Sequence, residues 1–150
     1  MAVNGIDSIN AKLLQELQED ARTSVAELGR RVGLSAPAVA ERLQRLEAEG
    51  VIRGYRTEVD PRALGYSLSA VMRIRPAPRQ LPKVAELARK TPEIVECHRV
   101  TGEDCFYMRL HVRSIEELEE LIDRFLIYGT TTTSIVQSSP VQPRALPTRA

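Results

Sequence analysis

Arginines gather in one short stretch of this 150-residue chain. Residues 30–56 contain six Arg against three Glu, a net charge of +3, whereas the whole chain carries +1. The guanidinium group is planar and always charged, so it can hold guanine O6 and N7, or phosphate oxygens, through paired hydrogen bonds. This stretch is therefore a candidate surface for a polyanion. The arginines that we single out are Arg31, Arg42, Arg45, Arg53 and Arg56.

Thiol and imidazole groups offer a second candidate chemistry, because Cys97, His98, Cys105 and His111 lie close together in sequence. A thiol nucleophile requires a histidine beside the cysteine, and a zinc site requires short paired spacings such as C-x2-C. Cys97 and His98 are adjacent and would face opposite sides of a strand, while Cys105 and His111 would lie about 20 Å apart along one strand. We therefore expect no metal site and no catalytic residue, and a small enzyme is the less favoured alternative.

Composition narrows the class of protein further. Hydrophobic residues make up 43% and charged residues 27% of the chain, values typical of a globular protein with one large domain or two small ones. Two cysteines cannot form a disulfide scaffold. The sequence has neither a signal-peptide pattern nor an apolar run of 18 residues, so we expect no membrane association and a cytoplasmic location.

Helical spacing of apolar residues predicts that most of the arginines belong to an array of three helices. One helix covers residues 7–19, a second begins at the capping residue Ser24 and ends at Gly33, and a third is capped by Ser35 and closed by Gly50. Two helices joined by a short turn with glycine are typical of a helix-turn-helix motif. Spacing alone fits an ordinary αα-hairpin equally well.

The third predicted helix carries an exposed face that suits a DNA groove. Ala38, Arg42 and Arg45 lie at positions i, i+4 and i+7, away from the apolar stripe, and the major groove of double-stranded DNA admits such a helix. The side chains expected to contact DNA from this helix are Ser35, Ala38, Arg42 and Arg45. The alternative is that the arginines pair with Glu41 and Glu49 on a solvated face.

Two short β-prone runs flank Gly54 within residues 51–59, which predicts a small hairpin, the wing of a winged helix. Arg53 and Arg56 would then reach backbone phosphates, and Arg31 completes the predicted DNA-binding set. We expect a winged helix-turn-helix domain over residues 1–60. Residues 61–66 read as a linker.

Residues 67–139 show the order strand, helix, strand, strand, helix, strand. This order predicts an α+β chain whose second domain is a ferredoxin-like βαββαβ fold, with one sheet and both helices on one face. The uncovered face would carry Val71, Cys105 and Tyr107 among polar residues, and a second copy of the same sheet is the expected cover. Residues 140–150, with three prolines, read as an extended or loose tail.

This combination of domains resembles the Lrp/AsnC (feast/famine) transcriptional regulators over about residues 6 to 139. The stretches that carry the resemblance are Ile6-Asp7, Leu13-Leu14, Leu17, Val32 to Ser35, Arg42 to Tyr55 and Val100 to Gly102. The resemblance implies a homodimer that binds DNA through its N-terminal domains and dimerises through its sheets, and dimers that can assemble further into tetramers or octamers. It also implies an amino acid or related small molecule as effector at the interface between dimers, and no cofactor.

In the family, effector contacts cluster around a Gly-x-x-Asp-Tyr-like segment and the last strand. The matching segment here runs from Gly102 to Phe106, with the aspartate one residue early and Cys105 in its usual place. Free N–H groups near the glycine can hold a carboxylate, and an acidic side chain can hold an ammonium group. The expected effector contacts are Gly102, Glu103, Asp104, Thr132, Thr133 and Ser134. An architectural DNA-binding protein without an effector, in which this segment is a plain solvated turn, is the alternative.

Overall fold

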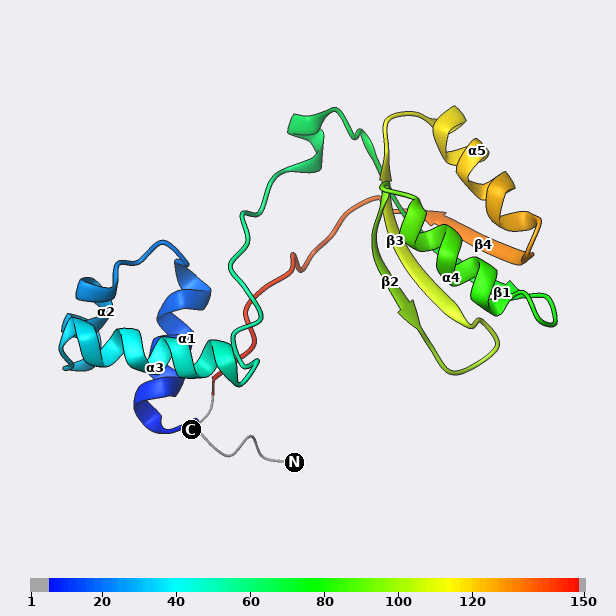
Figure 1. Cartoon of the computed structure of the whole chain (residues 1–150). Helices are drawn as coiled ribbons and strands as arrows, with labels where there is room; N and C mark the ends of the chain where they lie inside the picture. The colour runs from blue at the N-terminus through cyan, green and yellow to red at the C-terminus, as the bar shows by residue number, and fades with distance from the viewer. Residues whose placement is uncertain (1–5, 149–150) are drawn as a thin grey trace. The chain divides into compact units, whose positions relative to one another are not determined.

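A computed structural model describes residues 6–148 (Figure 1). The chain divides into an N-terminal unit, formed by Met1–Glu58 together with Val141–Ala150, and a C-terminal unit, Val59–Pro140. The residues expected to form a linker therefore belong to the C-terminal unit, where Pro61–Leu64 make a short 3-10 helix. The tail belongs to the N-terminal unit, so the chain passes between the two units twice.

The N-terminal unit contains the three expected helices. They are α1 (Ser8–Glu19), α2 (Val25–Val32) and α3 (Ala36–Ala48). Each helix begins where the sequence offers a cap, because a side-chain oxygen accepts a hydrogen bond from a backbone N–H of the first turn. The capping residues are Asp7, Ser24 and Ser35. The helices bury one apolar cluster, which consists of Leu13, Leu28, Val39, Leu43 and Leu46.

The expected wing hairpin is wrong: the structure contains no strand between residues 51 and 60. Val51 and Ile52 instead donate their backbone N–H groups to the carbonyl oxygen of Leu46, at 2.9 and 3.0 Å, and pack against the helical core. These hydrogen bonds satisfy a carbonyl group in the last turn of α3. The same two residues are then not free to form the first strand of a hairpin. The following residues up to Asp60 continue as an extended segment.

The C-terminal unit has the predicted βαββαβ order. Its elements are β1 (Leu68–Pro76), α4 (Leu81–Lys90), β2 (Ile94–Arg99), β3 (Phe106–Val112), α5 (Ile115–Leu126) and β4 (Gly129–Ile135). All recorded strand pairs are antiparallel, in the order β2-β3-β1-β4. One face of this sheet packs against both helices, since Met72 and Met108 from the strands share a core with Val84 and Phe125 from the helices. The ferredoxin-like prediction is confirmed.

The other face of the sheet, here called the open face, carries the alternate residues of each strand. Val71 lies opposite Arg109, and Arg73 lies opposite Tyr107, and Val71 and Tyr107 are half-buried as expected for this face. Cys105, however, precedes the strand and packs against the core. Its assignment to the open face was wrong, because strand alternation holds only from Phe106 onward.

None of the helices within residues 6–148 has the length and apolar character needed to cross a membrane. In the same part of the chain, no three His, Cys, Asp or Glu side chains converge as metal ligands would.

Candidate functional site

The turn between α2 and α3 depends on two glycines. Gly33 takes a left-handed conformation, with φ of 74°, which suits a residue without a Cβ. Gly29 is buried within α2, and a Cβ there would lie 2.5 Å from the carbonyl oxygen of Leu34. The backbone N–H of Leu34 donates to the carbonyl of Gly29 at 2.9 Å. The sequence analysis identified Gly33 but missed Gly29, whose signal is a glycine inside a helix.

The exposed side chains of α3 differ in part from those that we expected, because Gln44 is exposed and Ala38 is half-buried. Arg45 is exposed and pairs with Glu41, one turn earlier, at 3.2 Å. Gln44 is also exposed, and sequence reasoning missed it, although glutamine can bind adenine N6 and N7. Ala38 is half-buried, and the Ser35 hydroxyl accepts the backbone N–H of Ala38 at 3.4 Å as the helix cap.

Arg42 is held within the N-terminal unit. Its Nη1 atom donates to Asp7 Oδ2 at 2.7 Å and to Asn10 Oδ1 at 2.9 Å. Arg31 likewise donates to Glu16 of α1 and to Glu27 of α2. The hydrogen bond from Arg31 is the main cause that holds the pKa of Glu27 below its ordinary value. Two of the predicted DNA-binding arginines thus tie helices together.

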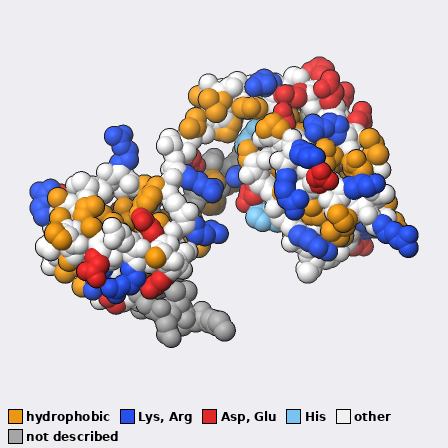
Figure 2. Space-filling model, viewed as in Figure 1, with side chains coloured by type: hydrophobic (Ala, Val, Ile, Leu, Met, Phe, Trp, Pro, Cys, Tyr) orange, Lys and Arg blue, Asp and Glu red, His pale blue; other side chains and the backbone are white. Residues whose placement is uncertain are grey.

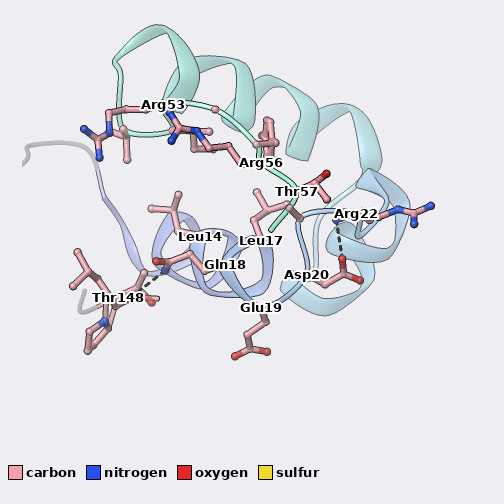
Figure 3. A pocket seen from close by; sticks show the side chains of 17 residues that line it. Leu14, Leu17, Gln18, Glu19, Asp20, Arg22, Arg53, Arg56, Thr57 and Thr148 are labelled. Atoms are coloured by element: carbon pink, nitrogen blue, oxygen red, sulfur yellow. Dashed lines mark hydrogen bonds between the residues drawn. The ribbon is translucent and has the colours of Figure 1, made fainter. Parts of the chain in front are cut away.

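Arg53 and Arg56 come from the extended segment after α3, and no ion pair is recorded for either within residues 6–148. They lie along an open groove of about 960 Å³ within the N-terminal unit. Figure 3 shows Leu14 and Leu17 of α1 on the opposite side of this groove. Gln18 donates to the carbonyl oxygen of Leu146 at 3.2 Å, so the tail also borders it.

Tyr55 connects the extended segment to α3. Its hydroxyl donates to Glu47 Oε1 at 2.9 Å. Removal from water, with the nearby carboxylate as the second cause, raises the pKa of Tyr55 to about 12. The hydrogen bond joins the segment that carries Arg53 and Arg56 to α3.

On the face of the N-terminal unit that Figure 2 shows, the basic side chains do not form one continuous patch. On the face shown in Figure 2, blue and red side chains alternate over this unit. On this face, attraction of a polyanion would depend on individual arginines rather than on a general positive field.

The segment from Gly102 to Asp104 lies beside two arginines of β1. Gly102 has φ of 113°, and open space surrounds the position of a Cβ. Asp104 pairs with Arg73 at 3.3 Å, and Glu103 pairs with Arg75 at 2.7 Å. Although the aspartate stands one residue early, its carboxylate meets an arginine of the open face.

The predicted hydroxyl groups of β4 do not share one face. Thr132 is paired with Arg73 and Ser134 with Val71, so both point to the open face. Thr133 is paired with Met72 on the covered face, and its hydroxyl oxygen is buried without a hydrogen-bond partner among the described residues. The structure thus brings Asp104, Arg73 and Thr132 to one region and directs Thr133 away from it.

Comparison with known proteins agrees with this geometry. The family model for the AsnC-type helix-turn-helix domain matches residues 6–47, and the model for the Lrp/AsnC ligand binding domain matches residues 69–146. The chain belongs to the Lrp/AsnC family. It is 32% identical over 133 residues to the HTH-type transcriptional regulator LrpC of Bacillus subtilis, which covers 89% of this chain and 92% of that protein.

Other relatives have the same architecture. The HTH-type transcriptional regulator LrpA of Mycobacterium tuberculosis is 38% identical over 120 residues, 79% of this chain and 80% of that protein. The solved structure of LrpC has a TM-score of 0.87 at 30% identity and covers 92% of this chain and 99% of that chain. A transcriptional regulator of Neisseria meningitidis, solved as a complex with L-Met, has a TM-score of 0.88 at 27% identity. The match covers 95% of this chain and 96% of that chain. This Lrp/AsnC chain is a helix-turn-helix transcriptional regulator.

We predict that Gly29→Ala destabilises the N-terminal unit by roughly 1–3 kcal/mol, because the added methyl group overlaps the Leu34 carbonyl oxygen and forces the helices apart. Urea denaturation followed by circular dichroism measures the loss. Gly33→Asn is the matched control, since its site is open and asparagine tolerates the left-handed conformation. Equal stability of Gly29→Ala and the unaltered protein would show that α2 and α3 do not need this close approach.

Proposed function

We propose that this Lrp/AsnC regulator binds specific sequences of double-stranded DNA by placing α3 in the major groove. The observation that carries the proposal is the exposure of Arg45, whose side chain is 63% exposed and pairs with Glu41, one turn away and 75% exposed. Such a pair contributes about 0–1 kcal/mol and can be exchanged for a guanine edge. Gln44 stands next to it, while Ser35 and Ala38 bring the start of the helix close to the DNA.

Arg53 and Arg56 supply contacts to the phosphate backbone in this proposal, because both are exposed and lie just after α3. Arg31 serves mainly to join α1 and α2, since two carboxylates hold its guanidinium. We infer a regulatory rather than an enzymatic role, because the matching family domain and the relatives are those of transcriptional regulators. A regulator of this kind acts where its operators are, in the cytoplasm.

We predict that Arg45→Ala weakens binding to a selected operator by roughly 1–3 kcal/mol and leaves binding to unrelated DNA nearly unchanged. Arg53→Ala should weaken binding to all sequences and make the salt dependence shallower by about 0.9 in log–log slope, the value for one lost phosphate contact. Fluorescence anisotropy with labelled duplexes over a range of salt concentrations separates these results. The assignment of α3 fails if Arg45→Ala leaves selectivity intact.

We infer that two copies associate through the open face of the sheet. Half-buried Val71 and Tyr107 lie there, and charged neighbours surround them in complementary pairs such as Arg109 with Glu96, 3.1 Å apart. A face of this kind can meet its own copy around a two-fold axis. Higher assembly of such dimers into tetramers or octamers is an extension of the same proposal.

We predict that Val71→Asp lowers the oligomeric state, because the new carboxylate would meet its own copy in a dry interface. Light scattering coupled to size-exclusion chromatography measures the mass. Leu126→Asp is the control, since Leu126 is 48% exposed on α5 of the helical side. An unchanged mass for Val71→Asp, with the unaltered protein assembled, would exclude the open face as the interface.

An amino acid is the proposed effector. The Neisseria meningitidis relative was solved as a complex with L-Met, and the Arg73–Asp104 pair offers one cation and one anion, 3.3 Å apart, on the open face. A zwitterion can replace this pair by placing its carboxylate on Arg73 and its ammonium group on Asp104. Gly102 backbone, Glu103, Thr132 and Ser134 border the same region, whereas Thr133 contributes only through the packing of β4.

We predict that one or more of the twenty amino acids stabilises the protein, by about 2.7 kcal/mol at 100 times its Kd. Asp104→Asn should abolish this stabilisation, because the amide cannot neutralise an ammonium group. Thermal-shift screening measures both, and Glu119→Gln on exposed α5 is the matched control. If no amino acid raises the melting temperature, the protein is an effector-independent architectural DNA-binding protein.

A further inference from the structure

Three polar side chains join the start of α1 to the middle of α3. Arg42 Nη1 donates to Asp7 Oδ2 and to Asn10 Oδ1, at 2.7 and 2.9 Å. The other carboxylate oxygen, Asp7 Oδ1, accepts the backbone N–H of Asn10 at 2.7 Å. One carboxylate therefore caps α1 and binds α3 at the same time, although Asp7 and Arg42 are 35 residues apart in sequence.

This cluster is partly removed from solvent. The Arg42 side chain is 29% exposed and Asn10 is 7% exposed, whereas the Asp7 side chain is 51% exposed. The backbone N–H of Asn10, followed by the Arg42 guanidinium, holds the pKa of Asp7 below its ordinary value, so the carboxylate is charged at neutral pH. If Arg42 swung out to reach DNA, the buried Asn10 oxygen would lose this donor and the pair with Asp7 would break.

Arg45, one turn further along α3, has the opposite setting. Its recorded partner is Glu41 on the same helix, and both side chains are well exposed. Arg45 can leave that partner without disturbing the packing of the unit, since an exposed i,i+4 pair contributes little. The two arginines of α3 therefore suit different tasks, although they look equivalent in the sequence.

We propose that Asp7 is a positioning residue for DNA recognition that acts through Arg42. The core packing of α3 sets its position, and the pair, by tying the middle of α3 to the start of α1, adjusts the direction in which Arg45 and Gln44 point. The inference rests on the proposed recognition by α3, and it removes Arg42 from the residues that read bases.

Removal of Asp7 separates the two possible roles of Arg42, because they lead to opposite results. Asp7→Ser in the full-length protein keeps a good helix cap but removes the charged partner of Arg42. The probes are a duplex selected from a random library by the unaltered protein and an unrelated duplex of equal length. Asp7→Asn is a second variant that keeps the size of the side chain, in case the first one folds poorly.

We expect Asp7→Ser to lower the ratio of selected to unrelated affinity by about three- to tenfold, with an unchanged salt slope, since contacting residues are coupled to this extent. Arg42→Ala should lower the ratio by a similar factor, and the double variant should lose no more than either single one. A merely structural role would lower the thermal midpoint and weaken both duplexes alike, which would overturn the proposal.

A direct DNA contact by Arg42 would give a different pattern. Asp7→Ser would then free the guanidinium and raise affinity, and Arg42→Ala would make the salt slope shallower by about 0.9. Either result overturns the proposal. Arg45→Ala tests the proposed function separately. If Arg45→Ala loses selectivity and Asp7→Ser does not, only the positioning role of Asp7 is wrong. If Arg45→Ala binds DNA unchanged, recognition by α3 is itself wrong.

Discussion

The close approach of α2 and α3 at Gly29 is the constraint on which the DNA-binding unit depends. With no Cβ at this position, the carbonyl oxygen of Leu34 lies where a methyl group would otherwise be, and the turn between the helices is reduced to a few residues. Val39 and Leu43 of α3 then reach Leu28 and form the core of the unit. Because protein cores are packed as densely as crystals of small molecules, a small change in this crossing would redirect every side chain on the exposed surface of α3.

Most of the fold could be predicted because its signals are local. Asp7, Ser24 and Ser35 cap helices as their sequence context indicates, and the alternation along β1 and β3 matches the buried and exposed faces of the sheet. The wing could not be predicted correctly, because β-prone residues form a strand only when a partner strand is available. Val51 and Ile52 find a better arrangement against the end of α3, through the hydrogen bonds to Leu46.

The candidate site was harder to predict, for two physical reasons. Helical spacing places residues around an axis, but it does not show which charged side chain a distant carboxylate will hold, and Asp7 is 35 residues away from Arg42. In a run of consecutive hydroxyl residues, the sequence does not show which side chains face which side of the sheet. Only the pairing of β4 with β1 shows that Thr133 points away from Thr132. In both cases the decisive information is a contact between segments that are far apart in the sequence.

The covalent path of the chain bears on the proposed effector site of the open face. Arg73 lies on β1, the strand that follows the connection from the N-terminal unit, and Thr132 lies on β4, the strand that precedes the return. The two residues are direct neighbours across the β1–β4 pairing. The return segment then binds α1, where Gln18 donates to Leu146. Both connections to the helix-turn-helix therefore start from β1 and β4, the pair of strands that carries Arg73 and Thr132, whereas Asp104 lies in the turn before β3. A ligand bound at the proposed site would contact the strand from which each connection starts.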